Sequence, residues 1–61
     1  MPEILVHIVE GRSPEAKKAL MKDITDAVVK NFGTDPNAVT VTIMEAPKTL
    51  KMKGGKLFSE R

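Results

Sequence analysis

A long helical pattern at residues 14–32, placed between two short runs rich in β-branched residues, most constrains what this chain can fold into. Residues 4–9 are almost continuously apolar, and residues 39–45 alternate apolar and polar side chains, as strands do. Two strands joined by a long crossover helix lie parallel, with a right-handed connection. The sequence therefore predicts a single βαβ unit of the α+β or α/β class, in one domain covering residues 1–61.

The ends of the helix carry boundary signals. Ser13 is placed to cap the first turn, Pro14 suits the first helical position, and Gly33 suits a left-handed cap. An apolar stripe at four-residue spacing is predicted to pack on the sheet, whereas the charged residues are predicted to face solvent. The stripe consists of Ala16, Leu20, Ile24, Ala27, Val28 and Phe32, and the charged set of Lys17, Lys18, Lys22, Asp23, Asp26 and Lys30.

The C-terminal quarter predicts a loop over residues 48–55 and a short hairpin segment. Gly54-Gly55 marks a tight turn, and residues 56–58 are long enough for one short pairing segment. Residues 46–61 carry five basic side chains against one acidic, a net of +4, whereas residues 1–45 have a net of −2. Such a basic segment could bind a polyanion, bind a carboxylate or remain solvated.

The first strand predicts that a single copy of the chain is incomplete. Its two faces carry Ile4, Val6 and Ile8 on one side and Leu5, His7 and Val9 on the other. One helix covers only one face, and two strands leave two unpaired edges. A chain of 61 residues without cysteine has no disulfide to compensate for a small core. We therefore expect an obligate homo-oligomer, in which His7 packs as a strand residue rather than acting as a catalyst.

The composition argues against several classes of function. The chain has no cysteine and His7 is its one histidine, which leaves no clustered ligands for zinc. Neither a metal ion nor a cofactor is expected. The longest apolar run is far shorter than the about 20 residues of a membrane span, and no signal-peptide pattern is present. We expect a cytoplasmic protein that does not bind membranes.

Pro2 has two interpretations. Because proline lacks a backbone N–H inside a chain, it is common at the first position of a strand. If Met1 is removed, as a small second residue generally permits, Pro2 instead carries a free secondary amine. An α-amine titrates at about 7.7–8.0, so this group could serve as a general base.

The chain resembles the 4-oxalocrotonate tautomerase family over almost its whole length. The resemblance rests on Pro2 behind Met1, the stretch EILVHIVEGR, the helix opening SPEAKK, a second strand ending at Glu45, and the pair GG near the C-terminus. The stretch HIVEGRS is its most specific part. The resemblance implies a cofactor-independent isomerase built of βαβ subunits. It further implies a homohexamer, a trimer of dimers, in which the strands of two subunits form one four-stranded sheet.

The resemblance also implies roles for individual residues. Pro2 is implied as the general base that moves a proton between an oxygen and a carbon of an enol or dienol acid. Arg12 is implied to bind a substrate carboxylate from a neighbouring subunit, and Val9 to line the pocket. An apolar pocket and a nearby cation both lower the pKa of the Pro2 amine. The expected substrate is a small 2-hydroxydienoate or 2-oxoenoate, similar to 2-hydroxymuconate.

Two positions depart from the family pattern. Well-known members have a second arginine in the second strand, and Thr40 stands at that place here. They also have an aromatic residue four positions before the glycine pair, where this chain has Lys51 or, with a one-residue shift, Leu50. Lys51 or Lys53 could supply the missing positive charge. Thr40 and Lys51 therefore join Arg12 as candidate substrate-binding residues.

Three functions follow as alternatives. The first is a tautomerase that uses Pro2 and Arg12 as described. The second is an oligomer that binds nucleic acid or another polyanion through its C-terminal lysines, which is disfavoured because that loop has no interleaved aromatic residue. The third is a catalytically silent member that keeps only the fold.

Overall fold

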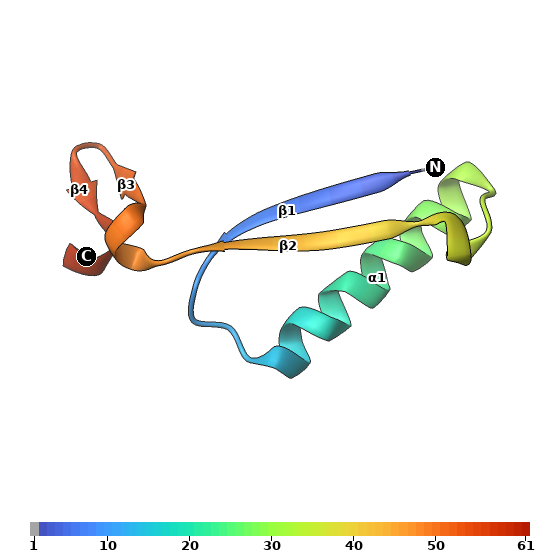
Figure 1. Ribbon diagram of the computed structural model, residues 1–61, viewed down its shortest axis with the longest axis horizontal. Coiled ribbons are helices and arrows are strands. Elements are labelled where there is room, and N and C mark those ends of the chain that lie inside the picture. Colours follow the sequence, from blue (N-terminus) through green and yellow to red (C-terminus); the bar gives the residue numbers. More distant parts are fainter. Residues whose placement is uncertain (1) are drawn as a thin grey trace.

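The structure is a computed structural model that describes residues 2–61, so Met1, on whose removal the hypothesis for Pro2 depends, lies outside the described residues. Strand β1 (Glu3–Val9), helix α1 (Pro14–Phe32) and strand β2 (Thr40–Ala46) follow in that order (Figure 1). The two strands are parallel, with Glu3 opposite Thr40 at one end and Val9 opposite Ala46 at the other. The predicted βαβ unit is confirmed.

The second strand is shifted by one residue from its predicted bounds of 39–45. Val39 is instead the C-cap of the preceding short helix η1 (Pro36–Ala38), because its N–H donates to the Pro36 carbonyl at 3.2 Å. The strand instead continues through Ala46, the residue before Pro47, where extended backbone is favoured. The Asp35 side chain caps η1 by accepting the Asn37 N–H at 2.9 Å.

The boundaries of α1 are those that the sequence predicts. The Ser13 hydroxyl accepts the Ala16 N–H at 3.1 Å, which satisfies one of the free donors of the first turn. Gly33 adopts φ +66°, and its N–H donates to the Val29 carbonyl at 2.9 Å. Glycine suits this left-handed cap because it has no Cβ that would clash in that conformation.

The face of α1 that packs on the sheet differs from the predicted stripe. The half-buried residues of the helix are Lys17, Met21, Ile24, Thr25, Val28 and Val29. Ala16, Leu20, Ala27 and Phe32, all predicted to pack, stay exposed, and Phe32 is 73% exposed. The helix therefore turns one part of its apolar surface to the strands and leaves an adjacent part uncovered. Residue spacing alone could not choose between the two parts, because together they form one continuous apolar arc.

The two faces of the sheet have different surroundings, although both are apolar. Ile4, Val6 and Ile8 are half-buried, with Val41 and Ile43 at the opposite positions of the first two. Leu5 and His7 lie on the other face and are exposed, opposite Thr42 and Met44 respectively. We call this second side of the sheet the open face. The prediction that one helix covers only one face is confirmed.

The C-terminal segment is more regular than the predicted loop. It contains the short helix η2 (Lys48–Leu50), the antiparallel strands β3 (Met52–Lys53) and β4 (Lys56–Leu57), and the terminal turn η3 (Phe58–Glu60). Gly54 and Gly55 both have positive φ angles, +60° and +80°, as a two-residue hairpin turn of type I′ requires. The hairpin lies beyond the ends of β1 and β2, at the opposite end of the molecule from the N-terminus (Figure 1).

Glu10 attaches this segment to the sheet. Its N–H donates to the Ala46 carbonyl at 3.0 Å, and its carboxylate accepts the Lys48 N–H at 3.1 Å. The carboxylate therefore caps η2 at the point where the chain leaves β2. This contact fixes the direction in which the hairpin departs from the sheet.

A single chain has no buried core. None of the residues 2–61 is fully buried, and Leu5 and Met44 on the open face are 56% and 48% exposed. The chain exposes 4780 Å², whereas a folded monomer of 6.7 kDa exposes about 3900 Å². Its radius of gyration is 14.5 Å, against about 10.5 Å for a compact chain of this length.

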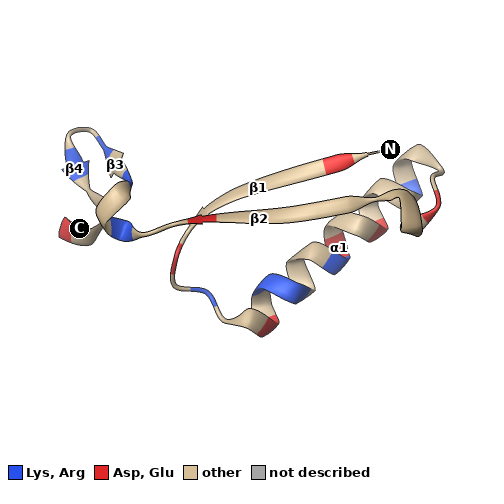
Figure 2. Ribbon diagram, viewed as in Figure 1, with Lys and Arg blue, Asp and Glu red and all other residues tan. Residues whose placement is uncertain are grey.

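The charged residues of the two strands lie near the strand ends. Glu3 is the only Asp, Glu, Lys or Arg within β1 and Glu45 the only one within β2, whereas lysines gather on the C-terminal segment (Figure 2). Within residues 2–61, no helix has both the length and the apolar character needed to cross a membrane.

Candidate active site

Pro2 and Thr40 lie together at one end of the sheet. Pro2 is half-buried and directly precedes β1, and its carbonyl accepts the Thr40 N–H at 3.0 Å. Thr40 is the first residue of β2. Two residues 38 positions apart in the sequence are thus brought into contact by the parallel pairing of the strands.

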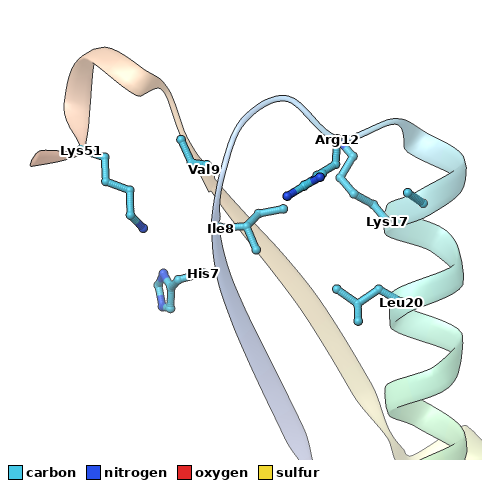
Figure 3. Close-up of a pocket in the computed structure, with 8 residues that line it drawn as sticks. His7, Ile8, Val9, Arg12, Lys17, Leu20 and Lys51 are labelled. Carbon is cyan, nitrogen blue, oxygen red and sulfur yellow. The ribbon is translucent and has the colours of Figure 1, made fainter. Parts of the chain in front are cut away.

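The other three candidates line a cleft at the opposite end of the sheet. The cleft has a volume of about 450 Å³ and is lined by His7, Ile8, Val9, Arg12, Ala16, Lys17, Leu20 and Lys51. Val9 ends β1, Arg12 belongs to the connection to α1, and Lys51 links η2 to β3. Figure 3 shows Arg12 reaching toward Ile8, while Lys51 comes from the C-terminal segment and points toward His7.

The predicted site residues therefore form two groups within one chain. Pro2 and Val9 are separated by the whole of β1, which at about 3.3 Å per residue amounts to about 23 Å. A proton acceptor at Pro2 cannot reach a small molecule bound by Arg12 of the same chain. One copy of the chain holds both halves of the expected site, but at opposite ends.

The cleft combines an apolar wall with positive charge. The described residues contain two ion pairs, Lys17–Glu45 and Lys22–Asp26, and neither involves Arg12 or Lys51. The charges of Arg12 and Lys51 are therefore not neutralised by a carboxylate of the described chain. A small organic anion fits this combination, because its carbon skeleton can contact the wall while its charge meets the cations.

Lys17 was wrongly predicted to lie on the solvated side of the helix. Its ammonium pairs with the Glu45 carboxylate at 3.0 Å, and the two side chains are 24% and 35% exposed. Glu45 follows Ile43 by two residues, so strand alternation puts it on the covered face, where a cation on the first turn of α1 can meet it. That alternation was the signal in the sequence that could have revealed the pair.

Sequence reasoning also missed the helix contribution to the cleft. Ala16 and Leu20 were predicted to pack beneath the sheet, but they are exposed and form the wall opposite Ile8. His7 was predicted to be packed, and in the single chain it is exposed and lines the cleft. Among residues 2–61, no three His, Cys, Asp or Glu side chains lie close enough together to hold a metal ion.

Comparison with known proteins identifies the family. A family model described as "Tautomerase enzyme" matches residues 2–61. A protein named "probable tautomerase" from Bradyrhizobium diazoefficiens is 57% identical over 61 residues, which cover 100% of this chain and 91% of that protein.

Two solved structures share the fold. TomN, a 4-oxalocrotonate tautomerase homologue of the tomaymycin biosynthetic pathway, superposes with a TM-score of 0.92 at 38% identity, covering 98% of this chain and 92% of that one. A heterohexameric 4-oxalocrotonate tautomerase from Chloroflexus aurantiacus superposes with a TM-score of 0.90 at 30% identity, covering 98% and 97%. The fold is thus that of the 4-oxalocrotonate tautomerases. The chain belongs to the tautomerase family.

Proposed function

We propose that the protein is a tautomerase that uses the amine of Pro2 as a general base on a small 2-hydroxydienoate or 2-oxoenoate. The observation that carries the proposal is the match of the tautomerase family model to residues 2–61, with Pro2 at the start of that match. Family membership supports an isomerase, and the cleft that contains Arg12 supports an anionic substrate.

The chemistry requires that Met1 is removed, because a proline nitrogen in a peptide bond has no basic lone pair. The free amine accepts the proton of the substrate hydroxyl and delivers it to a carbon of the same molecule, so that an enol becomes its keto isomer. Proton transfer by a positioned base contributes about 10²–10⁴-fold to the rate. The pyrrolidine ring fixes the direction of the lone pair, which reduces the ordering that the reaction must supply.

The separation of Pro2 from the cleft supports an active site shared between copies of the chain. In the described residues, β1 pairs with β2 alone, so its other edge is free. Pairing of two β1 strands in antiparallel directions would place Pro2 of one copy at the end of the sheet where the other copy holds Val9 and Arg12. The second copy would also cover an edge that is otherwise an aggregation hazard.

The proposed assembly is a homohexamer, a trimer of such dimers. Edge pairing leaves the open face uncovered, so further copies are needed to bury Leu5 and Met44. Compared with a compact monomer, the chain exposes an excess of about 900 Å². Each partner in a standard interface buries about 800 Å². The heterohexameric neighbour from Chloroflexus aurantiacus supports the same number of subunits.

The test compares turnover of a 2-hydroxydienoate, followed by ultraviolet absorbance, in three proteins. They are the chain with Met1 removed, verified by intact mass, its Pro2→Ala variant, and a chain extended by a bulky residue that keeps Pro2 in a peptide bond. Both altered proteins are expected to lose about 10²–10⁴-fold in kcat. The extended chain keeps the proline ring and isolates the role of the free amine. Undiminished turnover in either of them would refute the mechanism.

A further inference from the structure

Phe58 contacts Lys51 through both its backbone and its ring. The Phe58 N–H donates to the Lys51 carbonyl at 2.8 Å, which extends the pairing of β3 with β4 by one step. The Lys51 ammonium lies 5.9 Å from the centroid of the Phe58 ring, and the Arg61 guanidinium lies 5.5 Å from it. At these distances the negative face of an aromatic ring attracts a cation.

Lys51 differs from the other lysines of the hairpin. It is half-buried and lines the cleft, whereas Lys53 and Lys56 are exposed, lie opposite each other in the hairpin and do not line the cleft. Lys51 also takes part in neither of the two ion pairs of the described chain. Its charge is therefore directed at the cleft and remains available to a bound anion.

The cleft contains two such available cations, and they come from different directions. Arg12 enters from the β1–α1 connection and Lys51 from the C-terminal segment, as Figure 3 shows. A ligand with one anionic group can satisfy only one of them well. A ligand with two anionic groups at the ends of a short carbon chain can satisfy both.

We infer that Lys51 is a specificity-determining residue that selects substrates with a second anionic group, and that Phe58 is the residue that positions it. The inference rests on the proposed function for the identity of the reaction. A lysine side chain is long and flexible, so it binds an anion weakly unless it is held in place. The Phe58 ring restricts the Lys51 ammonium to the side of the hairpin that faces the cleft. The N–H donors of the ammonium stay free for the anion.

The experiment measures kcat and KM for two matched 2-hydroxydienoates, one with one carboxylate and one with two. Lys51→Met is expected to raise KM for the dicarboxylate about 10-fold and to leave KM for the monocarboxylate within about twofold. Phe58→Leu is expected to raise the dicarboxylate KM about threefold. Phe58→Trp, which keeps the attraction between the ring and the cation, is expected to keep the dicarboxylate KM at the parental value. The double variant of Lys51→Met and Phe58→Leu is expected to have the same dicarboxylate KM as Lys51→Met alone.

Lys53→Met is the matched control, because it removes the same charge from the same hairpin outside the cleft. It is expected to leave the KM ratio of the two substrates unchanged. An equal rise of the dicarboxylate KM in Lys53→Met and Lys51→Met would overturn the role of Lys51. An equal effect of Lys51→Met on the KM of both substrates would overturn it as well. If Phe58→Leu fails to assemble, Phe58→Met replaces it as the variant without a ring, and a dicarboxylate KM equal to that of the parent in this variant would overturn the positioning role.

Binding to unreactive saturated acids separates this inference from the proposed reaction. Isothermal titration of the parent and Lys51→Met with a saturated monocarboxylate and dicarboxylate of the same chain length needs no turnover. A preference for the dicarboxylate that Lys51→Met abolishes supports the inference even if Pro2→Ala keeps full activity. Absence of that preference overturns the inference even if Pro2→Ala is inactive.

Discussion

Arg12 is the residue of the cleft best suited to hold a carboxylate. Its guanidinium presents parallel N–H donors that match the two oxygens of a carboxylate, whereas a lysine offers a point charge. The side chain lies in an exposed connection and makes neither of the ion pairs of the described chain. Nothing in those contacts requires an arginine for the stability of the fold, which makes substitution at Arg12 a clean probe of binding.

We predict that Arg12→Gln raises KM for the substrate by about 10- to 100-fold, because a hydrogen bond to a charged group is lost. Arg12→Lys keeps the charge without the paired donors and is expected to fall between the parent and Arg12→Gln. Steady-state kinetics at constant ionic strength measure the effect. Lys18→Gln, at an exposed position of α1 outside the cleft, is the control and should leave KM unchanged. A KM for Arg12→Gln equal to that of the parent would remove Arg12 from the site.

The elements of the fold differ in how they are stabilised. Helix α1 has a side-chain cap at its start and a left-handed glycine at its end, so its boundaries depend on local contacts. The hairpin depends on two glycines in its turn and on the Glu10 contact to Lys48. Because Arg12 directly precedes the N-cap residue Ser13, the start of the helix also positions the Arg12 backbone, and with it the base of the Arg12 side chain.

The helix cap gives a prediction on stability. Ser13→Ala removes the acceptor of the Ala16 N–H and is expected to lower the free energy of unfolding by about 1 kcal/mol per chain. Ser13→Asp keeps an acceptor at that position and is expected to stay close to the parent. Denaturant unfolding measures the difference, at one protein concentration, because assembly contributes to the apparent stability. An unchanged midpoint for Ser13→Ala would show that the cap is not needed.

The whole molecule is an incomplete unit as a single chain. Its strands expose apolar side chains on the open face, and none of the described residues is fully buried. The expected site is divided between the two ends of the sheet. In the proposed assembly, the copy that pairs with the edge of β1 completes the site, and further copies cover the open face.

We predict that Leu5→Lys, which places a charge on the open face, shifts the protein to smaller assemblies. Burying an unpaired ammonium between copies is unfavourable, so dissociation relieves the cost. Sedimentation velocity measures the size of the assembly. Ala19→Lys adds the same side chain at an exposed position of α1 and should leave the assembly intact. Parental sedimentation of Leu5→Lys would contradict burial of the open face.

Local signals in the sequence were sufficient for the two long strands, the helix between them and their order. Ser13, Pro14 and Gly33 bound the helix through contacts with neighbours a few residues away, and strand alternation correctly separated the two faces of β1. The surplus of apolar surface also follows from the sequence, because two strands and one helix cannot cover it. For these features, the tertiary structure confirmed what the residue pattern already required.

Only the tertiary structure decided which residues meet. The rotation of α1 left Leu20 exposed and brought Lys17 to Glu45, because the helix has a wider apolar arc than two strands can cover. The pairing of Lys51 with Phe58 depends on the register of the hairpin. The separation of Pro2 from Arg12 follows from the length and direction of β1. Such contacts depend on how complete elements are placed relative to one another, which short-range residue patterns do not encode.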